Sequence, residues 1–285
     1  SLSALATEFQ NLPPSIRGAL GRATGNAAQL SDDRLQGLAE LLQNADDEGA
    51  DTAYFHVNDG SLFFGHNGSD FTLPDVWGLT IPWLSEKSGQ AEKLGRFGIG
   101  LKTLQSLSET LEAHNGHFHL RLGRSSLESA EPDPRWPNGP QTATTVFVVP
   151  FQHGTTTETE VASWLESWSD AGLLFLRSLR LVHLLDKHGQ SITTVGVSTG
   201  SPKQIESAGG IIVRTVVEAK DGRSWLRYLR DAKSPAGHRA GKAQQGTTSV
   251  AVAFPRFDGD QGHVHIGLPV RSIGLPFRFA AQFDP

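Results

Sequence analysis

The chain lacks cysteine and methionine altogether, and its 25 Lys and Arg residues are fewer than its 30 Asp and Glu residues. Without cysteine it can form neither a disulfide framework nor a thiol active site. It has no signal-peptide pattern and no apolar run long enough to cross a bilayer, which indicates a cytoplasmic protein. The net charge of −5 gives no electrostatic footprint for duplex DNA or for an anionic membrane.

What the chain does have is the composition of an ordinary globular protein. It is 38% hydrophobic and 19% charged, and 285 residues suffice for one large domain or two ordinary ones. The pattern of the sequence changes near residue 150, so we place one domain at 1–150 and a second α+β domain at 151–285. Because the pattern continues up to the final FDP, we expect the second domain to be truncated and the chain to be part of a longer protein.

The first 150 residues predict helices alternating with short strands. Ser31 is a suitable N-cap, and the apolar spacing after it predicts a helix that ends near Gly49. Asn58-Asp59-Gly60 between two β-rich runs predicts a hairpin. Further helices are expected from Thr72 and after the glycine-rich run at 95–100.

After residue 150, one helix is expected in TETEVASWLESWSDAG. The run LLFLRSLRLVHLLD predicts a helix that continues into a strand. The β-rich runs that follow are GGIIVRTVVEA, TTSVAVAF, HVHIGLPV and LPFRFAAQF.

The run ELLQNADD carries polar residues at helical spacing on an apolar helix. Residues four apart lie about 40° apart around a helix axis, so Glu40 and Asn44 share a face, with Asp47 close behind. One interpretation is a solvated helix surface. The other is an oxygen-ligand site, in which the Asn44 amide binds Mg²⁺ and Glu40 polarises a water for attack on a phosphate.

A second signal is GRFGIGLKT, in which three glycines precede a helix. Glycines allow close backbone approach, and free N–H groups at a helix start bind phosphate. Lys87 and Lys102 are available as phosphate countercharges. The run fits neither the dinucleotide fingerprint nor the P-loop, and a flexible turn with solvated lysines is the alternative.

Two further runs could contact a base. FFGHNGSDF, residues 63–71, is a turn that could pack against one, or a plain loop. Thr144-Thr145 begins TTVFVVPF, where a threonine is most often simply a β-former. The run HNGHFH contains three histidines but no Cys or carboxylate, so we do not expect a zinc site there.

Taken in order, these four runs resemble the motifs of the GHKL ATPases, and within them most closely the sacsin-type, heat-shock-chaperone-like ATPase domain. ELLQNADDEGA is similar to the family's N-box, and SEKSGQAEKLGRFGIGLKT to the sacsin and MORC form of its glycine box. The resemblance is strong over about 31–150 and weaker beyond. It implies an α+β protein: a Bergerat-fold two-layer α/β sandwich with a mixed, mostly antiparallel sheet and helices on one face, followed by a smaller α+β region.

The resemblance also implies roles for individual residues. Glu40 would be the general base, Asn44 the Mg²⁺ ligand and Asp47 a residue on the adenine side. The residues that would contact the rest of ATP are Gly95, Arg96, Phe97, Gly98, Ile99, Gly100, Lys102 and Lys87 at the phosphates, and Thr145, Asn67 and Gly68 at the base.

One departure from the family pattern concerns the base. Most GHKL proteins read the adenine amino group with the Asp of an Asp-x-Gly motif, whereas this chain has His66-Asn67-Gly68. Asn67 could accept a hydrogen bond from the amino group, and Asp70 is a second candidate.

The resemblance predicts an ATP-binding switch with slow Mg²⁺-dependent hydrolysis, as in a chaperone-like or remodelling ATPase. The alternatives are an ATP-sensing interaction module that does not hydrolyse, and a DNA-linked clamp like MORC or MutL. The expected partners are ATP or ADP, a protein client or further domains of the same chain, with a nucleotide-dependent dimer as one arrangement. Direct nucleic-acid contact is not expected, nor is membrane contact.

Two segments would respond to nucleotide. A lid at about 84–97 would become ordered on ATP. A cation of the loop 233–243, from Lys233, Arg239 or Lys242, could sense the γ-phosphate, although loop cations are usually solvated.

Overall fold

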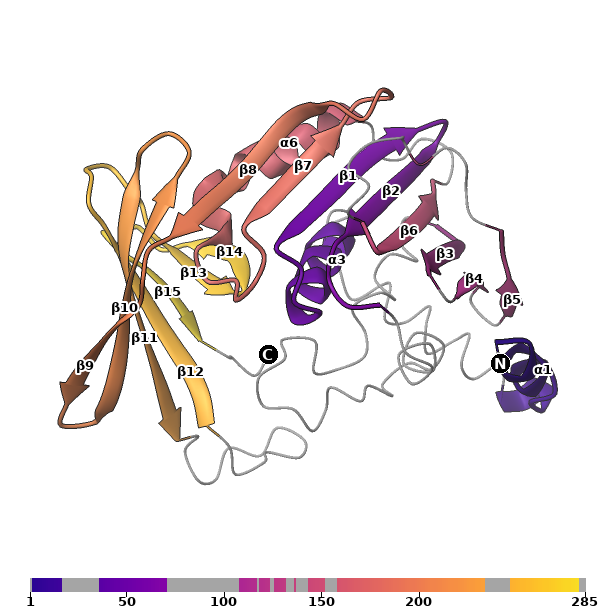
Figure 1. Ribbon diagram of the computed structural model, residues 1–285, viewed down its shortest axis with the longest axis horizontal. Helices are drawn as coiled ribbons and strands as arrows, with labels where there is room; N and C mark the ends of the chain where they lie inside the picture. The colour runs from indigo at the N-terminus through magenta and orange to yellow at the C-terminus, as the bar shows by residue number, and fades with distance from the viewer. Residues whose placement is uncertain are drawn as a thin grey trace. The chain divides into compact units, whose positions relative to one another are not determined.

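A computed structural model describes residues 2–16, 36–70, 108–116, 118–123, 126–131, 136, 143–151, 158–233 and 247–281. The described residues fall into two compact units (Figure 1). Unit 1 comprises the described residues up to Ser167 together with Arg177–Thr194, and unit 2 comprises Trp168–Leu176 and the described residues from Val195 onward. The domain boundary expected at residue 150 stays a prediction. In the described ranges, no helix has the length and apolar character needed to cross a bilayer.

Unit 1 is built on a sheet with the strand order β7-β1-β2-β6-β3-β4-β5. Its strands are β1 (Thr52–Asn58), β2 (Ser61–His66), β3 (Thr110–Asn115), β4 (His119–Gly123), β5 (Leu127–Ser129), β6 (Thr145–Pro150) and β7 (Leu181–Leu185). β1 and β7 are parallel, whereas the other neighbours are antiparallel. The predicted hairpin between β1 and β2 is confirmed, with Asp59 at φ 46° and Gly60 at φ 73°, as its tight turn requires.

Helices α1 (Leu2–Gln10), α3 (Gln36–Asp47) and α6 (Glu158–Trp168) belong to the same unit. α3 falls within the helix predicted from Ser31 to Gly49. It ends where Gly49 adopts φ 77° and the N–H of Ala50 donates to the carbonyl of Ala45 at 2.9 Å. α6 begins with two glutamates in its first turn, where negative charge suits the helix dipole.

The core of unit 1 contains an aromatic row across three strands. Phe55, Phe64 and Phe147 lie opposite one another on β1, β2 and β6. Their ring centroids are 4.9 Å and 6.3 Å apart, and Trp164 of α6 meets Phe55 edge-on at 6.1 Å. Because residues alternate across a sheet, this row fixes which face of each strand points toward α6.

Unit 2 contains the short helix η3 (Asp170–Leu173) and a second set of strands. They are the second half of β8 (Ser191–Thr199), β9 (Lys203–Ser207), β10 (Gly210–Ala219), β11 (Ser224–Lys233), β12 (Thr247–Pro255), β13 (His263–Ile266), β14 (Leu268–Ser272) and β15 (Arg278–Ala281). Their order is β8-β10-β11-β12-β15-β13-β14, and β9 also pairs with β10.

Unit 2 contains a buried polar cluster around Asp260. Trp225 is fully buried, and its indole N–H donates to Asp260 at 2.9 Å. Arg278 pairs with the same carboxylate at 2.8 Å, and the N–H of Gly262 donates to it at 2.9 Å. Burial alone would raise the pKa of Asp260, but these hydrogen bonds lower it to about 2.

The expected fold class is wrong. We expected a two-layer α/β sandwich with helices on one face, followed by a small α+β region. Instead, 48% of the described residues are in strands, these strands hydrogen-bond in one mixed sheet of 15 strands, and the described residues contain only four short helices. The helices expected after Thr72 and after Gly100 lie outside the described residues.

One cause of this difference is the run LLFLRSLRLVHLLD, residues 173–186. Its strand half is confirmed as β7, but η3 ends at Leu173 and residues 176–180 are irregular. The leucines at 173, 174, 176 and 179 are nevertheless fully buried, so the apolar spacing that predicted a helix reflects burial alone. The second cause is the long β-rich stretch 191–281, in which hairpins extend the sheet.

Candidate functional site

Helix α3 presents an apolar and a polar side, as its sequence predicts. Leu38, Leu41, Leu42 and Ala45 are fully buried. Glu40, Asn44 and Asp47 are all half-buried. A carboxylate and an amide one turn apart on the accessible side of an anchored helix can bind a cation or position a water.

Asp46, which the sequence analysis did not single out, anchors this helix. Its carboxylate is buried and accepts the backbone N–H groups of Arg177, Ser178 and Leu179 at 3.1, 2.7 and 2.9 Å. It therefore ties the end of α3 to the irregular segment that leads into β7. A signal for it was present, because Asp46 follows Leu42 at i+4 and so falls in the apolar stripe, where an acid must find partners.

Asn67 is engaged with the start of β1. Its side-chain carbonyl accepts the N–H groups of Asp51 and Thr52, both at 3.1 Å, and its amide donates to the Asp51 carboxylate at 2.8 Å. Hydrogen bonds from Thr52 and Asn67 lower the pKa of Asp51, against the opposing effect of burial. Two donors fill the lone pairs of the Asn67 carbonyl, so this arrangement favours a structural role over the predicted acceptance of an adenine amino group.

Gly68 lies against the end of α3. A Cβ there would be 2.8 Å from the carbonyl oxygen of Glu48 and 3.0 Å from the nitrogen of Ala50. The N–H of Ser69 donates to the Glu48 carbonyl at 2.9 Å, and the Thr144 hydroxyl donates to the Gly68 carbonyl at 2.6 Å. The absence of a side chain at Gly68 thus lets the end of β2, the start of β6 and the end of α3 meet.

A buried polar row crosses three strands at this corner. Thr145 on β6 lies opposite His66 on β2 and opposite Asn115 on β3. All three are buried. The N–H of Gly68 donates to Nδ1 of His66 at 3.1 Å, so in the neutral ring Nε2 carries the proton.

Thr145 is the member of this row that stands out. It is fully buried, and its hydroxyl finds no hydrogen-bond partner among the residues that the structure describes. A buried hydroxyl without a partner costs roughly 1–3 kcal/mol, so its retention needs a reason.

Asp70, the second candidate for the base, is exposed and lies beside the β3–β4 turn, where a Cβ at Gly116 would be 3.8 Å from its carboxylate.

Several predicted site residues cannot be placed in this geometry. The predicted residues that lie outside the described ranges are Lys87, Gly95, Arg96, Phe97, Gly98, Ile99, Gly100 and Lys102. The predicted lid at 84–97 and most of the loop 233–243 also lie outside them.

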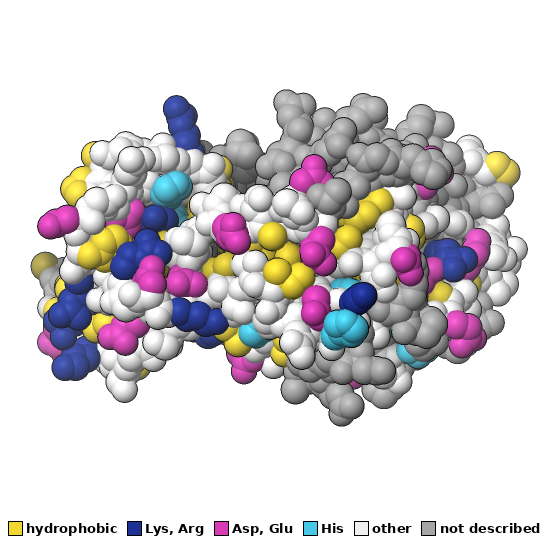
Figure 2. Space-filling model, turned by 90° about the horizontal axis from the view of Figure 1, so that it is seen from above, with side chains coloured by type: hydrophobic (Ala, Val, Ile, Leu, Met, Phe, Trp, Pro, Cys, Tyr) yellow, Lys and Arg dark blue, Asp and Glu magenta, His cyan; other side chains and the backbone are white. Residues whose placement is uncertain are grey.

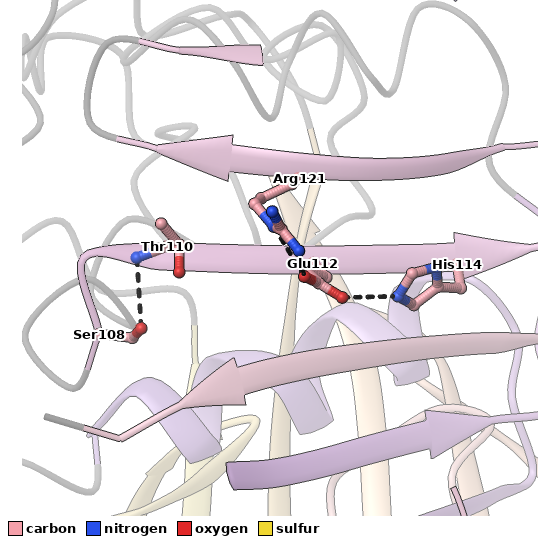
Figure 3. A network of polar contacts seen from close by, with 5 residues as sticks. All are labelled: Ser108, Thr110, Glu112, His114 and Arg121. Atoms are coloured by element: carbon pink, nitrogen blue, oxygen red, sulfur yellow. Dashed lines mark hydrogen bonds and ion pairs between the residues drawn. The ribbon is translucent and has the colours of Figure 1, made fainter. Parts of the chain in front are cut away.

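A different polar network occupies the other face of β3 (Figure 3). Glu112 accepts two hydrogen bonds from Arg121 on β4, with N–O distances of 2.6 and 2.8 Å, and lies 3.2 Å from Nε2 of His114. Glu112 and His114 alternate with Ala113 and Asn115 along β3. Because neighbouring strand residues point to opposite faces, this network is separate from the Thr145 row. It is a cross-strand ion pair that joins β3 to β4.

Within the described ranges, no group of three or more His, Cys, Asp or Glu side chains is arranged to hold a metal ion. No family model matches the chain, and no curated protein matches it.

Proposed function

We propose that the protein binds ATP with Mg²⁺ and hydrolyses it slowly, as a chaperone-like or remodelling ATPase of the GHKL kind that acts in the cytoplasm. The observation that carries the proposal is the Thr145 hydroxyl, buried and without a described partner, at the sequence position that the resemblance assigns to adenine. Half-buried Glu40 and Asn44 on α3, whose end packs against the same corner, also support it.

In this proposal each residue has one task. The Thr145 hydroxyl takes part in hydrogen bonding to the base, with Asp47 on the adenine side. Asn44 holds the Mg²⁺ ion, which supplies positive charge that neutralises the phosphates. Glu40 accepts the proton of the attacking water. The glycine box, Lys87 and Lys102 are proposed to contact the phosphates.

Calorimetry tests the binding step. ATP, a non-hydrolysable analogue and GTP are titrated with and without Mg²⁺ into the wild type and into Asn44→Ala. We expect Mg²⁺-dependent ATP binding that Asn44→Ala abolishes. Wild-type protein that binds no nucleotide would contradict the proposal, and the chain would then be an interaction module.

Turnover measurements separate the remaining alternatives. If the protein hydrolyses ATP, Glu40→Gln should keep nucleotide affinity and lose turnover, since one carboxylate oxygen is replaced by a group that cannot accept a proton. Binding without turnover in the wild type would instead favour an ATP-sensing module. Turnover stimulated by DNA would favour a MORC- or MutL-like clamp.

A further inference from the structure

We propose that one face of the unit 2 sheet is a docking surface for an acidic, amphipathic segment of a partner protein. This goes beyond the proposed ATP binding and does not depend on it. We call the surface the open face, and it is defined by two cross-strand rows: Arg214, Tyr228, Val252 and Phe279, and beside them Leu226 and Phe254. Residues directly opposite one another on neighbouring strands share a face, so the register alone assembles these side chains.

Five of the six residues of the open face are apolar or aromatic, and the face is not buried. None of its six residues is buried, and Phe254 is 45% exposed although its ring lies 6.0 Å from that of Tyr228 and 5.8 Å from that of Phe277. The opposite face of the same strands holds the core, where Val217, Trp225 and Ala253 are fully buried. An antiparallel sheet with one solvated face normally alternates apolar and polar residues. Contiguous aromatic and aliphatic residues on the solvated face therefore indicate a binding surface.

The charges on this face have one sign at its β9 edge. Lys203 on β9 lies directly opposite Arg214, and Arg230 lies on the next strand beside them, opposite Val250. Like charges directly opposite each other destabilise a sheet, and neither Lys203 nor Arg214 pairs with an acid among the described residues. Among the described residues, the acidic residue that the register places on this face is Glu218, at the end of β10 away from β9. An anionic partner would remove this repulsion.

The same asymmetry holds for the surrounding chain. Residues 195–285 contain twelve Lys and Arg against seven Asp and Glu, although the whole chain has a net charge of −5. Figure 2 shows clusters of Lys and Arg side chains at the left end of the view, with hydrophobic and acidic side chains among them. Charge complementarity thus selects an acidic partner.

The apolar rows select a polypeptide over a nucleic acid. Binding of a nucleic acid relies on a track of cations along the phosphates and on aromatic stacking. Here three cations lie at one edge, Val252 lies between Tyr228 and Phe279, and Leu226 lies opposite Phe254. A segment with apolar side chains on one side and carboxylates at one end matches this arrangement.

The test uses the full chain without nucleotide and a fluorescent 14-residue peptide of alternating Glu and Leu. Anisotropy titrations compare the wild type with the double variant Arg214→Glu, Phe254→Ser. We expect saturable binding by the wild type, weakening with salt, and at least a tenfold loss in the double variant. A peptide of alternating Lys and Leu, and one of alternating Glu and Ser, should bind at least tenfold more weakly than the Glu and Leu peptide.

A matched control is Lys187→Glu, Ile192→Ser, which changes the same kinds of exposed side chain near the β7–β8 turn and should leave binding unchanged. Urea midpoints establish that all variants are folded. The proposal is overturned if the wild type does not bind, if the double variant binds as well, or if oligo-dT binds as tightly as the peptide. Sedimentation showing that the wild type self-associates through this face would also overturn it, in favour of a second copy.

Discussion

At the scale of single residues, two adjacent threonines at the start of β6 differ in their surroundings. Thr144 is exposed and its hydroxyl donates to the carbonyls of Gly68 and His66, at 2.6 and 3.3 Å. Thr145 is fully buried, and its hydroxyl lacks a described partner. A structural threonine and a ligand-binding threonine should therefore respond differently to removal of the hydroxyl.

Thr145→Val keeps the side-chain shape and removes that hydroxyl. We expect stability to stay the same or to rise, because the lost group forms no hydrogen bond to a described residue, while ATP affinity falls about tenfold, roughly 1 kcal/mol. Thr144→Val is the matched control and should cost about 1 kcal/mol of stability. Urea unfolding and calorimetry give the two quantities, and unchanged ATP affinity in Thr145→Val would remove the residue from the site.

Asp46 provides a second prediction at this scale. Asp46→Ala leaves three backbone N–H groups between α3 and β7 without their acceptor, which we expect to cost about 3 kcal/mol or more. Asp47→Ala, the half-buried neighbour, should change stability by less than about 1 kcal/mol. Chemical denaturation measures both, and equal losses would contradict the anchoring role of Asp46.

At the scale of secondary-structure elements, the end of β2 packs directly on the end of α3. The contact is between backbones at Gly68 and residues 48–50, so neither partner can move aside as a side chain could. The position of α3, and with it of Glu40 and Asn44, depends on this contact.

Gly68→Ala tests the packing of these elements. The new Cβ would lie 2.8 Å from the Glu48 carbonyl oxygen, and we expect a loss of about 1–3 kcal/mol from the forced backbone shift. Gly200→Ala is the control, because a Cβ there meets its nearest neighbour at an ordinary 3.6 Å. Thermal unfolding compares the two variants, and an undisturbed Gly68→Ala would mean that α3 is positioned by other contacts.

At the scale of the whole molecule, stability depends on pH because the unfolded chain binds protons at pH values at which the folded protein does not. Burial, with the positive charges of Arg278 and His263 nearby, lowers the pKa of His265 from 6.5 to about 3. The unfolded chain takes up this proton as pH falls below about 6.5, but the folded protein does not. Stability is therefore full above pH 6.5 and is lost progressively toward pH 3. Asp260, with a pKa of about 2, adds a loss below about pH 3.8.

His265→Leu should remove the first of these losses. Between pH 6 and 4, we expect the free energy of unfolding of the wild type to fall by up to about 1.4 kcal/mol per pH unit more than that of the variant. His188→Gln, at an exposed turn, is the control and should follow the wild type. Urea titrations at a series of pH values measure the slopes, and parallel slopes for wild type and His265→Leu would refute the assignment.

The local features of the fold could be predicted from the amino-acid sequence. The spacing in ELLQNADD predicted which side of α3 is buried, Asn58-Asp59-Gly60 predicted the β1–β2 hairpin, and the β-rich runs predicted strands in the second half. Such features depend on residues within about four positions of one another, where backbone geometry is fixed by the chain itself.

The fold class and the contacts between distant polar groups could not be predicted in this way. Asp46 binds N–H groups more than 130 positions away, Asn67 is engaged by Asp51, and Thr145 lies between His66 and Asn115. These contacts depend on which distant segments become neighbours in the fold, which the hydrophobic spacing within one run does not specify. The same spacing also misled the prediction for residues 173–180, because it reports which side chains are buried and not the backbone hydrogen bonds that accompany burial.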